Sequence, residues 1–204
     1  MITINILTRT GNREKYFKTL EDSIKNQTYK NIRHIKSNDN PNCDYLIEKS
    51  DVINVIKDVT LGRGFYNTYL NTLGTKVTNG WIIILDDDSK LIDNTFIEKL
   101  ADKCSKYSEF DILIYKSFLL EEGNKYVIPS DKNFKNKIIQ RCGIDMACFC
   151  FHMNVFKSIQ FDGRLMGDYH FLEKISQSYN YKFNFIDLPI GIWANYDGAK
   201  KGKN

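Results

Sequence analysis

The sequence has no long apolar segment, no cysteine pattern and no basic cluster. No stretch approaches the roughly 20 apolar residues that cross a membrane, and no basic leader followed by an apolar run opens the chain. The 5 cysteines form no Cys-x-x-Cys pair, and their odd number argues against a disulfide framework and a zinc knuckle. We therefore expect no transmembrane segment and no signal peptide, and a reducing, cytoplasmic location.

The charge distribution excludes a second group of functions. The formal net charge is +4, with 29 Lys plus Arg against 25 Asp plus Glu, and the basic residues are scattered along the chain. A nucleic-acid-binding protein usually gathers its basic residues on one face, so we expect no nucleic-acid partner, whereas a mild excess suits a small anionic substrate. A hydrophobic content of 42% is ordinary for a globular protein, and no repeat or linker divides the chain. One domain over residues 1–204 is the simplest organisation.

The most informative stretch is an apolar run, residues 81–85, that leads directly into Asp86, Asp87 and Asp88. Such a run is typical of a buried, parallel-type strand. Ligands of open α/β sheets bind beyond the carboxyl ends of such strands, which is where these three aspartates, here called the aspartate triplet, would stand. Because alternate side chains of an extended chain share a face, we expect Asp86 and Asp88 to point together and Asp87 away.

Two converging carboxylates attract a hard cation. Mg²⁺ and Mn²⁺ prefer oxygen ligands, and Mg²⁺ is usually held by one or two carboxylates together with substrate phosphates. The alternative is a polar turn, since Asp clusters also favour turns and helix caps, and residues 93–95 could cap the next helix in that way.

The first half of the chain alternates strands and helices. We predict strands at 2–7, 31–36 and 52–56, a helix at 14–26, and a helix after residue 65. The loop at 8–13 would place Thr8 and Arg9 beside the strand ends. Asp39 follows the second strand, where it either faces the ligand or forms a turn. Arg63 lies between two glycines, which suits either close approach to a diphosphate or a flexible connection.

The second half contains another acidic position. We predict a helix at 94–106, strands at 111–120, 146–151 and 183–188, and a polar segment at 121–137 that is either a lid or a plain hairpin. Asp168 precedes an apolar helix, so it is either an N-cap or a carboxylate that the helix dipole keeps ionised at the site. The tail at 193–203 is polar and basic, which suits either disorder or a segment that folds over a bound phosphate.

With these residues in view, the sequence resembles the GT-A glycosyltransferases, and within them the inverting glycosyltransferase family 2. The likeness rests on the opening loop 8–13 with 22–24 and 26–29, on the strand and Asp-x-Asp motif at 80–88, and on the Gly-Asp pair within 166–171. It spans nearly the whole chain and is strongest with short bacterial and viral members, which share the Phe-His pair at 151–152. It departs from the family at Asn38-Asp39, where two acids are usual, and at Gly167, which replaces a Glu.

The resemblance implies a single GT-A domain, Rossmann-like, with a mixed central sheet flanked by helices. Residues 1–90 would bind the nucleotide sugar and the metal, and residues 91–204 the acceptor. It implies a metal-dependent inverting transfer from a UDP-sugar to a hydroxyl of a glycan or glycoprotein acceptor, with Asp168 as the catalytic base.

The remaining expected roles also come from the resemblance. Asp88 and Asp86 would hold Mn²⁺ (or Mg²⁺) and through it the donor diphosphate. Either Arg63 or the basic tail would assist the departing UDP. The nucleotide-sugar pocket would be formed by Thr8, Arg9, Asp39, Arg63, Asp86 and Asp87, and the candidates for the acceptor or metal side are His152 and His170.

Two other functions fit the same residues. A nucleotidyltransferase also pairs a strand-end Asp motif with Mg²⁺, but it normally has a Gly-rich phosphate loop after the first strand, and the loop at 8–13 contains one glycine. The second alternative is a non-catalytic domain that binds a nucleotide sugar.

Overall fold

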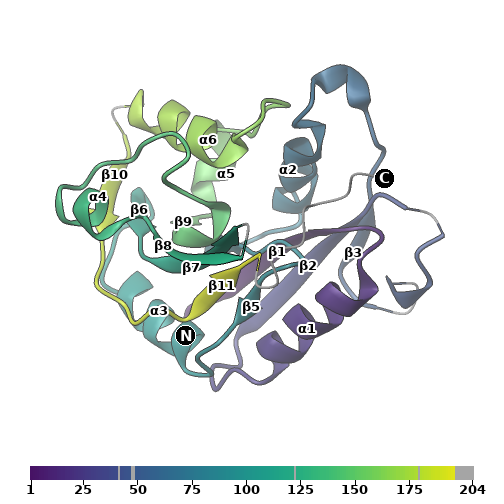
Figure 1. Cartoon of the computed structure of the whole chain (residues 1–204), viewed down its shortest axis with the longest axis horizontal. Helices are drawn as coiled ribbons and strands as arrows, with labels where there is room; N and C mark the ends of the chain where they lie inside the picture. The colour runs from purple at the N-terminus through teal and green to yellow at the C-terminus, as the bar shows by residue number, and fades with distance from the viewer. Residues whose placement is uncertain (41, 47–48, 122, 179, 196–204) are drawn as a thin grey trace.

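A seven-stranded mixed sheet forms the centre of the molecule (Figure 1). The computed structural model describes residues 1–40, 42–46, 49–121, 123–178 and 180–195. The strands of this sheet are β1 (Ile4–Thr10), β2 (Ile32–Asn38), β3 (Val52–Asn54), β4 (Trp81–Ile84), β6 (Asp111–Ile114), β9 (Phe149–His152) and β10 (Lys182–Phe185). Their order across the sheet is β10-β6-β9-β4-β1-β2-β3, so β4 and β1 lie at its centre.

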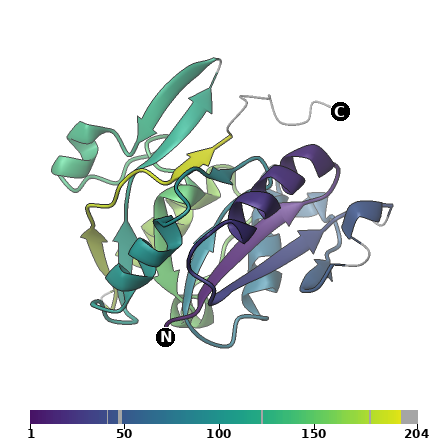
Figure 2. The ribbon, with the colours of Figure 1, turned by 90° about the horizontal axis from the view of Figure 1, so that it is seen from below.

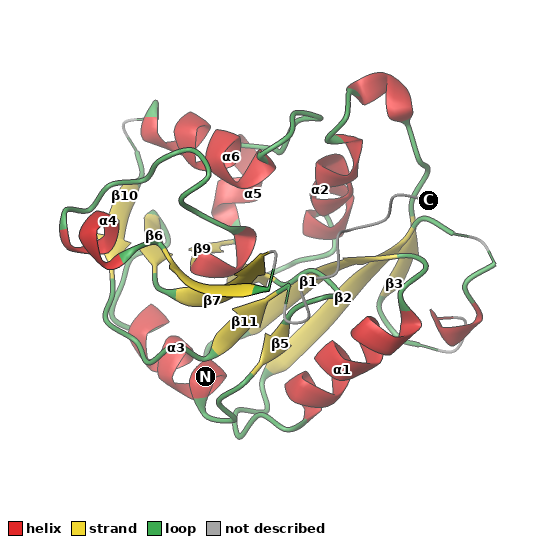
Figure 3. Ribbon diagram, viewed as in Figure 1, coloured by secondary structure: helices red, strands yellow, loops and turns green. Residues whose placement is uncertain are grey.

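Helices cover both faces of this sheet (Figure 3). One face carries α1 (Glu14–Lys25) and α3 (Phe96–Cys104); the other carries α2 (Tyr69–Gly74), α5 (Asn154–Ser158) and α6 (Gly167–Ser176). The all-apolar β4 explains this arrangement, because Trp81 and Ile83 pack on the first helix layer while Ile82 and Ile84 pack on the second. A strand that is buried on both faces has to be apolar at every position.

Parallel pairing aligns the strand ends that matter for the site. β1 runs parallel to both β2 and β4, with Leu7 opposite Ile84 and Thr10 opposite Asn38. The segments that follow these three strands therefore leave the sheet at the same edge. On its other side β4 pairs with β9, which is antiparallel, so the expected parallel environment of the central strand holds on one side only.

A second, four-stranded sheet was not predicted. It has the order β5-β11-β7-β8 and consists of β5 (Lys90–Leu91), β7 (Ser117–Glu121), β8 (Asn124–Ile128) and β11 (Ile192–Ala194). The predicted strand at 111–120 is thus two strands in different sheets. The segment at 121–137 contains part of the β7–β8 hairpin, as one of the two alternatives expected, and also the helix α4 (Asp131–Lys135) (Figure 2).

The remaining predicted elements are close to those observed, and the fold class is confirmed. The strand expected at 146–151 is the 3-10 turn η4 (Met146–Cys148) followed by β9, and three further 3-10 turns are η1 (Asp44–Leu46), η2 (Val59–Leu61) and η3 (Phe65–Thr68). The predicted polar tail begins with β11, whereas its basic residues beyond position 195 lie outside the described residues. None of the described helices has the length and apolar character that crossing a bilayer requires.

Candidate active site

The aspartate triplet forms a turn at the carboxyl end of β4. The strand ends at Ile84, residues 87 and 88 lie in a turn, and the backbone N–H of Ser89 donates to the carbonyl oxygen of Asp86 at 2.8 Å. The three carboxylates consequently do not alternate as they would in an extended chain. The expectation that Asp86 and Asp88 share a face is therefore wrong, and the turn geometry assigns them to different arginines.

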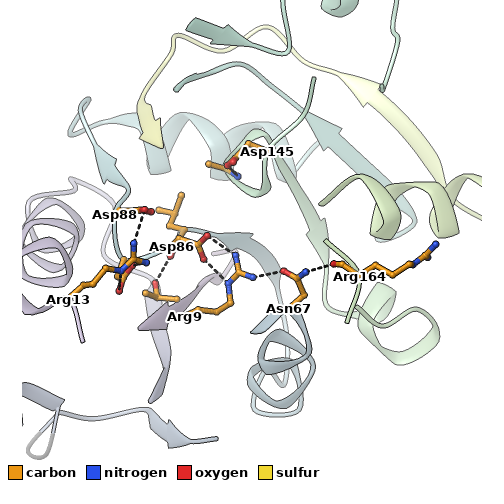
Figure 4. Close-up of polar contacts among 11 residues, drawn as sticks. Arg9, Arg13, Asn67, Asp86, Asp88, Asp145 and Arg164 are labelled. Carbon is orange, nitrogen blue, oxygen red and sulfur yellow. Dashed lines mark hydrogen bonds and ion pairs between the residues drawn. The ribbon is translucent and has the colours of Figure 1, made fainter. Parts of the chain in front are cut away.

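Asp86 binds Arg9, which stands at the same edge on β1. The Arg9 Nε donates to Asp86 Oδ1 at 2.7 Å, and Arg9 Nη2 donates to Oδ2 at 2.6 Å (Figure 4). Such a two-point pair between a guanidinium and a carboxylate fixes both groups in orientation. Burial lowers the pKa of Arg9, but Asp86, together with Tyr66 and Asp145, more than offsets this, and the net pKa is raised. Arg9 and Asp86 were both predicted site residues, and the fold brings them together.

Asp87 and Asp88 share a second arginine, Arg13, which the sequence analysis did not select. The Arg13 guanidinium donates to both oxygens of Asp87 and to Asp88 Oδ2, the last at 3.0 Å. Asp87 is 0% exposed. Burial raises its pKa to about 7, although Arg13 acts in the opposite direction. Asp87 therefore anchors Arg13 instead of facing a ribose, which corrects its predicted role. A second arginine in the loop after the first strand was the signal for it.

Thr8 is a buried residue of β1 that holds the backbone directly before the aspartate triplet. It is 0% exposed, and its hydroxyl donates to the carbonyl oxygen of Leu85 at 2.8 Å, directly before Asp86. The same hydroxyl lies 2.9 Å from Nε2 of His34, whose pKa burial lowers to about 3, so the imidazole is neutral. Because the Thr8 side chain is sealed inside the sheet, its predicted role as a pocket-lining residue is wrong.

Asp39 lies beside the loop that follows β1. A Cβ at Gly11 would stand 2.1 Å from Asp39 Oδ1, so a residue larger than glycine at position 11 would displace the carboxylate. The Tyr69 hydroxyl lies 3.4 Å from Asp39 Oδ2. Asp39 thus stands at the predicted edge of the sheet, on the β2 side of the aspartate triplet.

Asp168 reaches the site from the second helix layer. It is the second residue of α6 and half-buried, and its Oδ1 accepts from the backbone N–H of Tyr169 at 2.7 Å. Burial raises its pKa to about 7, and the negative charges of Asp145 and Asp86 act in the same direction, while the Tyr169 N–H and Arg9 oppose it. The charges of Arg9 and Asp86 therefore both act on the Asp168 carboxylate, although 82 positions separate Asp86 from Asp168 in the sequence.

Asn67 and Asp145 are two further residues of the site that the sequence analysis missed. Asn67 is 2% exposed and accepts from Arg9 Nη1 at 2.5 Å, while its own Nδ2 donates to the carbonyl oxygen of Arg164 at 2.8 Å (Figure 4). Asp145 caps η4 by accepting from the N–H of Ala147 at 2.9 Å. The one signal for Asp145 was its position as an acid inside an apolar run.

Three predicted residues are not brought to the aspartate triplet. His152 lies opposite Trp81 because β9 is antiparallel to β4, which places it at the other end of the sheet, 3.8 Å from Glu109. His170 Nδ1 lies 3.2 Å from Glu173 on its own helix. Arg63 is exposed, and the described part of the chain gives it no ion pair with the aspartate triplet.

The carboxylate oxygens of Asp86 and Asp88 could bind a hard cation only if a bound ligand supplied further oxygen atoms to its coordination shell. The described residues contain no group of three or more His, Cys, Asp or Glu side chains arranged to hold a metal. Mg²⁺ nevertheless needs only one or two carboxylates when phosphates and water supply the rest. A carboxylate oxygen has more than one lone pair, so an oxygen that accepts from arginine keeps a site for a cation. Asp88 and Asp86, although they pair with different arginines, are the carboxylates that would hold a metal together with a diphosphate.

The fold is shared with solved structures of TarS from S. aureus. No protein-family model matches the sequence, and no curated protein matches it. The structure superposes on TarS with a TM-score of 0.68 at 14% identity, and on TarS 1–349 in complex with UDP with 0.68 at 13%. For TarS 1–349 in complex with UDP-GlcNAc the TM-score is 0.59 at 13% identity.

Each of these matches covers 95% of this chain. The chain spans 36% of the full TarS structure and 60% and 58% of the two 1–349 complexes. At these identities the likeness establishes the fold, which agrees with the predicted α/β architecture.

Proposed function

We propose that the protein is a glycosyltransferase that moves a sugar from a UDP-sugar to a hydroxyl of a glycan or glycoprotein acceptor, with inversion at the anomeric carbon. The observation that carries the proposal is the convergence of two groups: a strand-end carboxylate–arginine cluster, and Asp168 with a pKa near neutrality. TarS 1–349, which shares the fold, forms complexes with UDP and with UDP-GlcNAc, and this supports a nucleotide-sugar donor.

Asp168 has the properties of a general base. A base works best when its pKa lies near the working pH, because it is then largely ionised and still accepts a proton readily. Burial, Asp145 and Asp86 raise the pKa of Asp168 to about 7, far above the ordinary value of 3.8. In the proposed reaction Asp168 removes the proton from the acceptor hydroxyl while the hydroxyl oxygen attacks the anomeric carbon, and the bond from that carbon to UDP breaks.

The arginines, together with Asp86 and Asp88, would hold the donor. Guanidinium groups bind phosphate oxygens through paired N–H donors, and Arg13 keeps a side chain that is 32% exposed. Asp88 and Asp86 would hold Mn²⁺ (or Mg²⁺) together with the diphosphate. When bound, this ion would neutralise the charge that develops on the departing UDP. Asp39 would contact the uracil or the ribose from the adjacent strand end.

A transfer assay on the purified chain tests the proposal. UDP-GlcNAc and other UDP-sugars are supplied with glycan acceptors, with and without Mn²⁺, and both UDP release and product mass are measured. We expect transfer by the parental chain, and retained donor binding without transfer by Asp168→Asn. Transfer at the parental rate by this variant would remove Asp168 as the base. Donor binding without any turnover would instead identify a binding domain. Transfer of UMP to the acceptor, with sugar 1-phosphate as the leaving group, would identify a nucleotidyltransferase.

A further inference from the structure

We propose that Asn67 is a positioning residue that fixes the helix carrying Asp168 relative to the Arg9–Asp86 pair. The inference rests on the proposed function, because it assumes that Asp168 must face a donor held at the aspartate triplet. Asn67 comes from the first half of the chain and lies in η3, directly before α2. It contacts residues of both halves, and no signal in the sequence selected it.

The Asn67 carboxamide joins two segments that carry the proposed chemistry. Its oxygen accepts from Arg9 Nη1 at 2.5 Å, on the guanidinium that holds both oxygens of Asp86. Its nitrogen donates to the carbonyl oxygen of Arg164 at 2.8 Å, in the loop that leads into α6 (Figure 4). A continuous series of hydrogen bonds therefore runs from Asp86 through Arg9 and Asn67 to Arg164, in the loop directly before the helix that carries Asp168.

Close packing at two glycines makes this connection rigid. A Cβ at Gly167 would stand 2.5 Å from both Cγ and Nδ2 of Asn67, so the first residue of α6 lies directly against the carboxamide. A Cβ at Gly64 would stand 2.2 Å from the carbonyl oxygen of Arg164, and the Gly64 N–H donates to the carbonyl oxygen of Gly163 at 2.9 Å. The turn before α2 and the loop before α6 therefore touch backbone to backbone.

The chemistry of the position calls for a carboxamide. The Arg9 guanidinium needs an acceptor and the Arg164 carbonyl needs a donor, and asparagine supplies one of each from a short side chain. Aspartate would keep the acceptor but would face the Arg164 carbonyl with a second acceptor. Alanine would leave both partners without this contact in a buried place, where an unmade hydrogen bond is costly.

Asn71 offers a matched control one helical turn further on. Its Nδ2 donates to the carbonyl oxygen of Phe161 at 2.8 Å, and its Oδ1 accepts from the Phe161 N–H at 2.8 Å. Asn71 thus ties α2 to the same loop with the same chemistry, but its hydrogen bonds go to Phe161 instead of Arg9. The comparison separates a role in positioning from a general contribution to stability.

The test compares kcat, donor KM and melting temperature for the parental chain, Asn67→Ala, Asn67→Asp and Asn71→Ala. We expect similar losses of melting temperature for the two alanine variants. For Asn67→Ala we expect a fall in kcat of about 10- to 100-fold, because small displacements of reacting groups cost that much, and for Asn71→Ala a change within about twofold. Asn67→Asp, nearly isosteric and expected to fold, should lose kcat to a similar degree.

Two results would overturn the inference while leaving the proposed function intact: equal kcat in Asn67→Ala and Asn71→Ala, or parental kcat in Asn67→Asp. If the parental chain itself transfers no sugar from any UDP-sugar, the proposed function fails, and the positioning role fails with it.

Discussion

The proposed transfer reaction should depend steeply on pH, because Asp168, the proposed base, has to be ionised to accept a proton. Burial raises the pKa of Asp168 to about 7, with Asp145 and Asp86 adding to the effect. Below that pH the ionised fraction falls about tenfold for each pH unit, so kcat/KM at pH 6 should be about a tenth of its plateau value.

The variant Asp145→Asn tests the cause of this profile. It removes a negative charge that raises the pKa of Asp168, so the acid limb of kcat/KM should move to lower pH. An asparagine oxygen can still accept from the Ala147 N–H, which preserves the cap of η4. Asp162→Asn is the control: Asp162 pairs with Arg164 and Lys174 instead, and the limb should stay in place.

The same carboxylate should limit stability above neutral pH. The folded pKa of about 7 exceeds the ordinary value of 3.8, so the folded state binds the extra proton between these values. Its contribution is present in full below about pH 4 and is lost as the pH rises through about 7. At pH 8 the ionised Asp168 therefore lowers the free energy of unfolding by up to about 4 kcal/mol relative to pH 4. The variant Asp168→Asn should consequently unfold at a higher urea concentration than the parental chain at pH 8, but not at pH 4.

The measurements are kcat/KM from about pH 5.5 to about 8 and urea unfolding at about pH 4 and about pH 8. Two outcomes contradict the reasoning: a kcat/KM that is flat across this range, or an acid limb that Asp145→Asn moves to higher pH. Either would mean that the environment of Asp168 does not govern the proton transfer.

Three further predictions concern the groups around this base. Arg13→Met should lower the free energy of unfolding by about 3 kcal/mol, because it leaves the buried Asp87 without this cation. The control is Arg164→Met, which removes an exposed ion pair with Asp162 and should lower it by less than about 1 kcal/mol. Urea denaturation of both variants measures the difference. Asp88→Asn should weaken Mn²⁺ binding in the presence of UDP at least about tenfold by calorimetry, and unchanged affinity would remove Asp88 as a ligand. Gly167→Ala should push Asn67 aside and lower kcat about tenfold. Gly123→Ala is the control for kcat: its φ of 81° strains an alanine, but a Cβ there meets nothing within 4 Å, so kcat should not fall, and equal kcat in both variants would show that the contact is unimportant.

The large elements were predictable because each carries its own periodic signal. The apolar run at 81–85 has to be buried on both faces, and the spacing of Phe17, Leu20 and Ile24 selects one face of α1. The two-residue strand β5 and the three-residue strand β11 carry no such signal, since pairing with distant partners makes them strands. For the same reason the break between β6 and β7 could not be seen in a continuous β-type sequence.

At the site, the sequence by itself determined the kinds of groups present: a triplet of carboxylates after a buried strand, arginines in the loop after the first strand, and an acid at the start of a late helix. Tertiary structure decided how these groups pair. A turn directs Asp86 to Arg9 and Asp87 with Asp88 to Arg13, and the antiparallel β9 removes His152 from the site. The packing of η3 against α6 brings the Asn67 carboxamide to the start of α6, next to Gly167. Such pairings depend on contacts between residues far apart in the chain, and these exist only after the sheet and its two helix layers have formed.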